Sequence, residues 1–319
     1  MLSITLLGSG GGMPMPNRFL SSMLLNYQSR KILIDCGEGT QVAMRKNKCG
    51  FKSLDIICLT HCHGDHIFGL PGLLSTIGNS GRTDPITIVG PEDISDTMKS
   101  IMQVNPYLPY NIEIFEISGL SLRLTLTSRG FVINKDSSDK NGTVNLIIST
   151  LELDHSSACL GYSFCVPRRP KFYPEKAIRE NIPMKYWNRL QNGEIIVRGN
   201  RTYLPSMVLG KDRKGIKLSY ITDTRPIDTI PSFINKSDLF ICEGTYGNEA
   251  DIKKAHKNKH MTFAEAAQLA SSGNVKELWI THFSPAMDKP ELYINNATDI
   301  FTNTVLGQDG LRKALNYPD

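Results

Sequence analysis

A histidine-rich turn, directly after an apolar run, constrains this chain more than any other feature. The run at residues 56–59 predicts a buried strand. The turn after it carries three of the chain's seven histidines and one aspartate within six positions: His61, His63, Asp65 and His66. Isolated histidines are usually surface or core residues, but so dense a group indicates a metal site. Imidazole and carboxylate ligands favour zinc, with manganese or iron as alternatives.

The spacing of this motif, H-x-H-x-D-H, suits two neighbouring metal ions. On a tight turn the first two histidines point to one side, and Asp65 and His66 point to the other. We therefore expect the first pair to bind one ion and the second pair to bind its neighbour. Cys62 lies between two of these ligands but has no partner in a C-x-x-C motif, so we expect it to take no part.

Three later predicted strands each end in one further residue that can bind metal: His155, Asp223 and His282. Singly, such residues are more often turn or cap residues, although α/β folds do place their sites at strand ends. Together with the first motif they complete a set. His155 would finish a three-histidine site, and His282 would join Asp65 and His66. Asp223 could bridge both ions, which predicts two zinc ions per chain.

These residues suit the hydrolysis of a phosphodiester. Two adjacent ions lower the pKa of a shared water and stabilise the attacking and departing oxygens. Asp65 has a free oxygen that could accept the remaining proton, and His260, oriented by Glu243, is the candidate acid for the leaving oxygen. Glu265 is less suited to orient His260, because it is already used in a predicted capping box with Thr262 at the start of a helix. Alternatively, His260 is a solvent-facing residue and Glu243 a turn residue.

Composition agrees with a globular protein that is not embedded in a membrane. The chain has 319 residues, 40% of them hydrophobic, which suits one α/β sandwich with an insertion as well as two domains. The net charge of +5 permits an anionic or nucleic-acid partner without requiring one. Seven cysteines, an odd number and mostly in apolar strands, favour a reducing compartment. With no predicted signal peptide or transmembrane stretch, we expect a cytoplasmic location.

Periodicity predicts alternating strands and helices on both sides of a strand-rich middle. The expected strands are 4–7, 22–26, 31–35, 56–60, 86–89, 218–222, 239–242 and 277–281, and the expected helices are 67–77, 91–104 and 263–272. Region 110–165 is strand-rich, with a polar hairpin turn at 136–142. We predict a single domain over residues 1–319 with an arm inserted at about 167–201.

The predicted arm mixes basic, aromatic and proline residues with little apolar periodicity, so we expect it to bury little surface. Basic side chains can contact phosphates, and aromatic rings can stack or pack on sugars. The candidate substrate-binding residues are Arg168, Arg169, Lys171, Tyr186 and Trp187. The alternative is that the arm is a dimer contact or a substrate lid.

The motifs resemble those of the metallo-β-lactamase fold and, within it, of the tRNase Z family, the endonucleases that mature the 3′ end of tRNA. The blocks that carry the resemblance span nearly the whole chain: 6–12, 32–40, 60–66, His155, 223–226, 242–245, 259–262 and 281–284. The resemblance implies a four-layer αβ/βα sandwich, precursor tRNA as substrate, and a homodimer in which one subunit's arm holds tRNA for the other's active site. The family's arm usually has Gly-Pro after its Ile-Pro, whereas Met184 and Lys185 follow Ile182-Pro183 here.

Two other sequence features allow more than one interpretation. The glycine-rich segment at 8–12 could present N–H groups to a phosphate, although it lacks the lysine and spacing of a P-loop; a turn that passes close to the metals is the simpler interpretation. Asp35 resembles a residue that orients a ligating imidazole, or else it is a turn residue. His256 has no assigned role, and we expect it to be solvated.

Three classes of function fit these patterns. The leading class is a zinc-dependent phosphodiesterase that cleaves RNA and removes the 3′ trailer of precursor tRNA. The second is a hydrolase of the same fold that acts on a cyclic phosphodiester, a sulfate ester or a lactone. The third is a zinc-binding module without turnover, which is disfavoured because every ligand position is filled.

Overall fold

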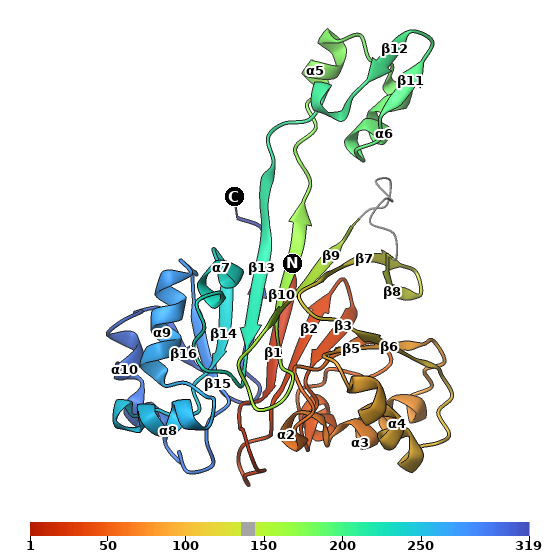
Figure 1. The fold of residues 1–319 in the computed structure, drawn as a ribbon. Helices are drawn as coiled ribbons and strands as arrows, with labels where there is room; N and C mark the ends of the chain where they lie inside the picture. The colour runs from red at the N-terminus through yellow and green to blue at the C-terminus, as the bar shows by residue number, and fades with distance from the viewer. Residues whose placement is uncertain (135–143, 319) are drawn as a thin grey trace.

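Two large sheets pack face to face in the computed structural model, which describes residues 1–134 and 144–318 (Figure 1). The predicted hairpin turn at 136–142 lies outside the described residues. The strands before and after it, β8 and β9, both pair with β7 and lie on opposite sides of it. Within the described residues, no helix is long and apolar enough to cross a membrane.

The first sheet has seven strands in the order β17-β1-β2-β3-β4-β5-β6. Their bounds are β1 Leu2–Gly8, β2 Ser22–Tyr27, β3 Arg30–Ile34, β4 Leu54–Cys58, β5 Ile86–Gly90, β6 Ile112–Glu116 and β17 Arg312–Leu315. Strands β3 to β6 are parallel to one another. The helices over its outer face are α1 Thr40–Lys46, α3 Leu70–Asn79 and α4 Ile94–Val104, while the short α2 Gly64–Ile67 follows β4. The sequence predicted α3 and α4 but not α1.

The second sheet has eight strands in the order β16-β15-β14-β13-β10-β9-β7-β8. Their bounds are β7 Ser121–Thr127, β8 Gly130–Ile133, β9 Leu146–Glu152, β10 Leu160–Arg168, β13 Arg213–Ile221, β14 Leu239–Glu243, β15 Leu278–Thr281 and β16 Thr304–Leu306. Helices α7 Ile230–Ile234, α9 Phe263–Ser272 and α10 Asn295–Thr298 pack on its outer face, and α8 Ile252–Lys257 precedes α9. The helix α9 has the predicted bounds and the predicted capping box, since Thr262 Oγ1 accepts from Glu265 N and Glu265 Oε2 accepts from Thr262 N.

Three apolar clusters separate four layers, as the predicted sandwich requires. One cluster lies between the sheets and includes Ile32, Tyr162 and Leu218. A second lies between the first sheet and its helices, and a third between the second sheet and α7, α9 and α10. Both faces of the central strands are therefore buried, which explains why every residue of β4 and β14 is buried and why apolar and polar residues do not alternate.

Strand direction brings the polar strand ends together at one edge. Strands β13, β14 and β15 are parallel, so the residues after them meet at the same end of the sheet. Strand β10 is antiparallel to β9 and β13, so β9 ends and β10 begins there as well. The histidine turn after β4 reaches this edge from the first sheet. In Figure 1 these loops lie at the lower end of the molecule.

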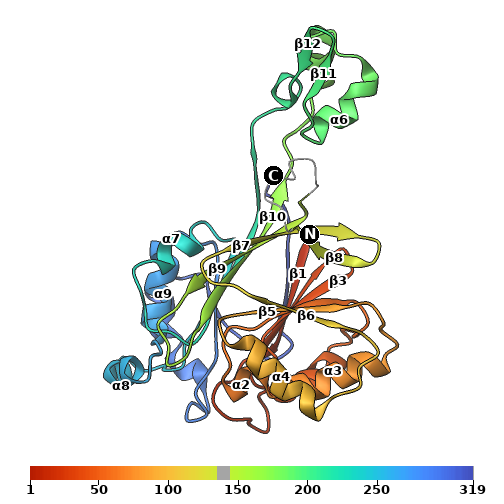
Figure 2. The ribbon, with the colours of Figure 1, turned by 45° about the vertical axis from the view of Figure 1, so that its right-hand side comes forward.

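The arm leaves from the opposite end of β10 and β13 (Figures 1 and 2). It covers residues 169–212, longer than the predicted 167–201, because β13 does not begin until Arg213. It contains α5 Pro174–Arg179, α6 Trp187–Gln191, β11 Ile196–Arg198, β12 Arg201–Tyr203 and two short 3₁₀ turns, Met184–Tyr186 and Pro205–Met207. Nine of its side chains are Lys or Arg and four are Asp or Glu, a net charge of +5 that equals that of the whole chain.

The expectation that the arm buries little surface is wrong, because the arm has its own apolar core. That core consists of Ala177, Ile182, Tyr186, Leu190, Ile196, Tyr203 and Val208. Tyr186 is only 7% exposed, with its ring 5.4 Å from that of Tyr203. Trp187 donates from Nε1 to the carbonyl of Ile182 (2.9 Å) and packs on Phe172. Burial leaves Tyr186 little surface for RNA, and Trp187 contributes mainly to the packing of the arm.

Candidate metal centre and active site

The predicted metal ligands lie together where the two sheet edges meet. One cluster consists of His61, His63, His155 and Asp223, and the other of Asp65, His66, Asp223 and His282. Within each cluster the potential ligand atoms all lie within 4.8 Å of one another. The grouping is the one that the sequence predicted, with three histidines on one side and the Asp65–His66 pair with His282 on the other.

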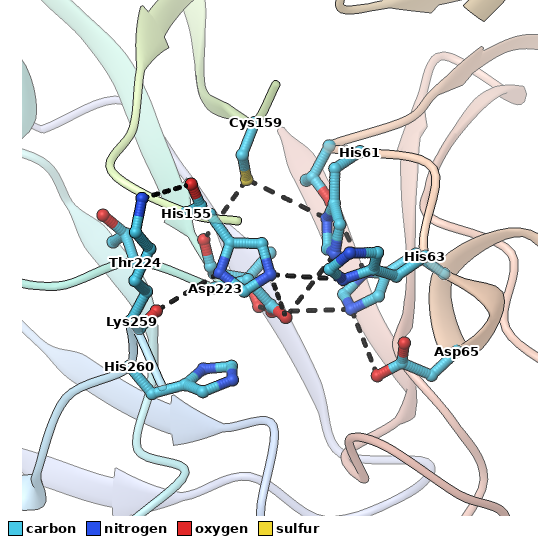
Figure 3. Close-up of polar contacts among 12 residues, drawn as sticks. His61, His63, Asp65, His155, Cys159, Asp223, Thr224, Lys259 and His260 are labelled. Atoms are coloured by element: carbon cyan, nitrogen blue, oxygen red, sulfur yellow. Dashed lines mark hydrogen bonds and ion pairs between the residues drawn. The ribbon is translucent and has the colours of Figure 1, made fainter. Parts of the chain in front are cut away.

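Asp223 belongs to both clusters and offers a different oxygen to each. Its Oδ2 lies 3.6 Å from His61 Nε2 and 3.8 Å from His155 Nε2. Its Oδ1 lies 3.4 Å from His66 Nε2 and 3.1 Å from His282 Nε2. Figure 3 shows the carboxylate between the rings. Such a placement suits a carboxylate that bridges two cations.

The electrostatics of the clusters fit a divalent metal. His61 Nε2 is buried and has no hydrogen-bond partner, and burial lowers the pKa of His61 well below its usual value, so the ring stays neutral. A buried lone pair without a partner is costly unless a ligand satisfies it. Burial would raise the pKa of Asp223, but neighbouring histidines hold it well below its usual range. His61 therefore offers a neutral imidazole and Asp223 an ionised carboxylate, the forms that bind metal.

Hydrogen bonds from outside the clusters orient the ligands. Asp35 Oδ2 lies 2.8 Å from His66 Nδ1, which turns Nε2 toward the cluster, and its Oδ1 accepts from Thr60 N (2.8 Å). On the other side, His282 Nδ1 lies 3.0 Å from Thr245 Oγ1. Asp35, Asp223 and His282 all have positive φ angles (57°, 47° and 60°), a conformation that concentrates at functional sites. The orienting interpretation of Asp35 fits this geometry better than that of a simple turn residue.

The glycine-rich segment after β1 passes directly beside the clusters. Gly12 donates its N–H to Asp65 Oδ2 (2.7 Å). A Cβ added at Gly11 would lie 2.4 Å from the His282 ring, so only glycine fits there. These contacts support the interpretation of the segment as a turn that lets the chain pass close to the site. The Gly12 N–H binds the Asp65 carboxylate and is therefore not available to a phosphate.

His260 lies beside the second cluster and is held by Glu243. Its Nδ1 donates to Glu243 Oε1 (3.0 Å), and the same carboxylate accepts from Thr224 N and Thr245 Oγ1. Burial alone would lower the pKa of His260, but the charge of Glu243 and the hydrogen bond outweigh it and raise the pKa to about 9. The ring is therefore protonated at neutral pH, as a proton donor must be.

Cysteines near the site act as neutral neighbours. Cys62 belongs to neither cluster, and burial raises the pKa of its thiol, as expected for a residue that takes no part. Cys159 Sγ lies 3.9 Å from His61 Nδ1 and donates to the carbonyl of Thr222 (3.8 Å). Nothing in the sequence distinguishes Cys159 from the other buried cysteines, so its contact with a ligand was not predicted.

The sequence also did not predict a network of ion pairs and hydrogen bonds on the other side of the clusters. Asp154 pairs with Arg225 and with Lys259, and Lys259 contacts His155. Asp154 and Lys259 each directly precede a predicted site histidine, but their contact joins residues more than 100 positions apart and leaves no local pattern. The side chain of His256 is 44% exposed, as expected for a solvated residue, and its Nε2 also lies 2.5 Å from Glu265 Oε1.

The basic candidates for substrate binding are spread along the arm. Arg168 lies at its root, where the guanidinium donates to the carbonyl of Pro318 and covers the Tyr317 ring. Arg169 donates to Asn192 Oδ1 (2.6 Å). Lys171 is exposed, with its ammonium 5.3 Å from the centre of the Tyr173 ring. All three lie far from the metal clusters along the strands.

The sandwich and its paired histidine clusters define a metal-dependent hydrolase of the metallo-β-lactamase fold. Human tRNase Z, short form, superimposes with a TM-score of 0.67 at 23% identity, covering 99% of this chain and 100% of that one. The metallo-β-lactamase fold protein YhfI of Bacillus subtilis gives 0.66 at 18% identity, covering 98% and 100%. A family model described as Anti-Pycsar protein Apyc1 matches residues 2–102.

Sequence relatives give the family. A ribonuclease Z of Alkaliphilus oremlandii is 59% identical over 317 residues, which cover 99% of each chain. A ribonuclease Z of Clostridioides difficile is 55% identical over 319 residues and is matched over its whole length. The chain therefore belongs to the ribonuclease Z family, and the divalent-metal site described above is that of a hydrolase.

Proposed function

We propose that the chain is a single catalytic domain with a substrate-binding arm, and that it removes the 3′ trailer from precursor tRNA with the help of two zinc ions. The observation that carries the proposal is Asp223, which presents one oxygen to each of two ligand clusters. The names of the relatives, ribonuclease Z and tRNase Z, support RNA as the substrate class.

The two ligand sets favour zinc. One set would be His61, His63 and His155, the other Asp65, His66 and His282, with Asp223 shared. Imidazole-rich sets select zinc over magnesium or calcium, and the carboxylates leave manganese and iron(II) as alternatives. When bound, two such ions would lower the pKa of a water between them and stabilise charge on the attacking and departing oxygens.

The remaining chemistry is assigned to protein side chains. Water adds to phosphorus, the bond from phosphorus to the ribose 3′-oxygen breaks, and the products are a 3′-hydroxyl and a 5′-phosphate. Asp65, fixed by the Gly12 amide, accepts a proton from the attacking water. Because Glu243 occupies Nδ1 of His260, Nε2 of that ring is left to donate a proton to the departing 3′-oxygen.

The arm suits an RNA partner because it carries the chain's net positive charge. Its +5 balance lies on a unit that projects from the body (Figure 2). Apart from the arm, the basic and acidic side chains of the chain cancel. Lys and Arg on such a surface contact phosphates without reading sequence. Lys171 and Arg169 are the proposed contacts, and Arg168 would support the root of the arm.

The direction of the arm supports a homodimer. Strands β10 and β13 each have nine residues, so the arm begins roughly 30 Å from the metal end at ~3.3 Å per residue. The arm also points away from that end (Figure 1). An RNA gripped by the arm is therefore presented more easily to the active site of a second copy, related by a two-fold axis.

Replacing residues 169–212 by Asn-Gly tests the role of the arm. Arg168 and Arg213 are register partners, so a two-residue turn can close the hairpin without disturbing the strands. Hydrolysis of bis(p-nitrophenyl) phosphate should remain nearly unchanged, while precursor tRNA should bind more weakly. The slope of log affinity against log salt should become shallower by about 0.7–0.9 for each phosphate that the armless protein no longer binds.

Parallel assays on the parent decide between the function classes. Cleavage of a 3′-extended tRNA transcript to a 3′-hydroxyl end supports the proposal. Turnover of the small ester alone would favour the alternative, a small-molecule hydrolase. An armless variant that binds and cuts precursor tRNA as the parent does would show that the arm is not the RNA-binding element.

Mixing two defective chains tests whether the arm serves the partner subunit. One chain lacks the arm but keeps the metal site, and the other keeps the arm but carries Asp223→Ala. On precursor tRNA the Asp223→Ala chain alone should be inactive, and the armless chain alone should be much less active than the parent. Co-expressed chains should recover activity, because a mixed dimer pairs an intact arm with the intact site of its partner. No recovery in mixed dimers isolated with two affinity tags would mean that the arm acts within its own chain.

A cytoplasmic location is part of the proposal. It is supported by the state of the cysteines: all seven are described and none forms a disulfide.

A further inference from the structure

Lys259 and His155 hold each other through two separate contacts. The Lys259 ammonium donates to the carbonyl of His155 (2.8 Å), and His155 Nδ1 lies 3.3 Å from the carbonyl of Lys259. The ammonium also pairs with Asp154 Oδ1 (2.9 Å), whose other oxygen pairs with Arg225. Figure 3 shows both contacts between the two residues.

The contact at Nδ1 determines how His155 faces the metal cluster. A carbonyl oxygen can only accept, so Nδ1 must carry the proton and Nε2 must keep its lone pair. That Nε2 lies 3.2 Å from His63 Nδ1 and 3.8 Å from Asp223 Oδ2, inside the first cluster. The backbone of Lys259 therefore fixes both the tautomer and the direction of a ligand.

The same backbone leads directly into His260. Lys259 has a φ of 57°, a left-handed conformation that a lysine adopts only when its surroundings hold it there. The next side chain, His260, is turned toward Glu243. Lys259 therefore contacts the candidate ligand His155 and directly precedes the candidate proton donor His260 in the chain.

We propose that Lys259 is a positioning residue that holds the metal ligand His155 and the proton donor His260 in one fixed arrangement, with Asp154 anchoring its ammonium group. The inference rests on the proposed function only for the role of His260. Its role toward His155 concerns metal affinity and holds for any reaction at this site.

The contacts of Lys259 act by fixing the direction of His155 more than by stabilising the fold through ion pairs. The side chains of Lys259, Asp154 and Arg225 are 33–40% exposed, so each ion pair alone contributes little to folding. Partners that orient a metal ligand nevertheless change metal affinity or activity by about 10–100-fold when removed. The contribution of Lys259 should therefore be seen in metal binding and turnover and hardly in thermal stability.

Lys259→Ala is the principal test, with Lys257→Ala as its matched control. Lys257 is an exposed lysine two positions earlier, so both variants lose one positive charge near the site. Zinc affinity is measured by competition with a chromophoric chelator, and turnover is measured on bis(p-nitrophenyl) phosphate. Lys259→Ala should bind one of its two zinc ions about 10–100-fold more weakly, while Lys257→Ala should bind both as the parent does.

Two further variants separate the side chain from the backbone. Lys259→Gly accepts the left-handed φ without strain and keeps the carbonyl, yet it should lose zinc affinity as the alanine variant does, because the ammonium contacts are gone. Lys259→Arg keeps a cation in reach of Asp154 and should recover part of the loss. A glycine variant with parental zinc affinity would overturn the proposal.

Zinc binding also separates this proposal from the proposed function. Unchanged zinc affinity in Lys259→Ala, with a weaker and less salt-dependent binding of RNA, would assign Lys259 to a phosphate contact and overturn the positioning role. A parent that hydrolyses the small ester but not precursor tRNA would remove the proposed function, while the zinc titration would still decide the role of Lys259.

Discussion

Asp223→Ala should lower the metal content from two ions per chain toward one or none and abolish hydrolysis of every substrate. Asp223 is the only residue common to both clusters among the described residues, so its removal takes a ligand from each ion and leaves the neighbouring histidines without their shared counter-charge. His63→Ala should have a narrower effect, because His63 belongs to one cluster. Plasma emission measurements of zinc, together with turnover of bis(p-nitrophenyl) phosphate, report both quantities.

Asp228→Ala is a suitable control, since Asp228 is an exposed carboxylate five positions later that belongs to neither cluster. Asp223→Asn refines the comparison, because the amide keeps the shape of the side chain and removes its charge. Two zinc ions per chain and normal turnover in Asp223→Ala would contradict the assignment of a bridging ligand.

His260→Ala should keep both metal ions but slow the cleavage of precursor tRNA by roughly 10²–10⁴-fold, the usual range for a lost general acid. The ring belongs to neither of the two clusters that share Asp223, so its loss leaves those ligand sets complete. A p-nitrophenolate leaving group needs little protonation, so bis(p-nitrophenyl) phosphate should be affected much less. Single-turnover rates on both substrates, with zinc content measured in parallel, test this difference.

Glu243→Gln gives a second measurement of the same step. It keeps an acceptor for His260 Nδ1 but removes the charge that raises the pKa of the ring, so it should slow precursor tRNA cleavage less than His260→Ala does. Equal losses on the two substrates in His260→Ala would instead mean that the ring positions the substrate and does not donate a proton.

The grouping of the candidate ligands was predictable because each of them follows a strand that local pattern reveals. The apolar runs before His61, Asp223 and His282 identify buried strands, and strand ends in such folds converge. The residues that orient the ligands were harder to predict. Asp35 reaches His66 across 31 positions and Lys259 reaches His155 across 104, and contacts between distant segments leave no periodicity in the sequence.

The arm was misjudged for a related reason. Its helices and strands have three to six residues each, too short for a helical or alternating pattern to repeat. Its core is assembled from one or two side chains of each element, such as Ala177, Leu190 and Tyr203. The composition of the arm is therefore similar to that of an extended basic segment. The arm nevertheless folds into a compact unit with its basic side chains on the outside.

The antiparallel pair of β10 and β13 sets the distance between the arm and the metal end of the same chain. Adding one residue to a strand would turn the following side chains to the other face of the sheet, but adding two to each strand would preserve both faces and move the arm about 6.6 Å further from the body. In the proposed dimer, where each arm holds an RNA relative to the partner's metal site would then depend on the number of strand residues and not on the sequence of the RNA.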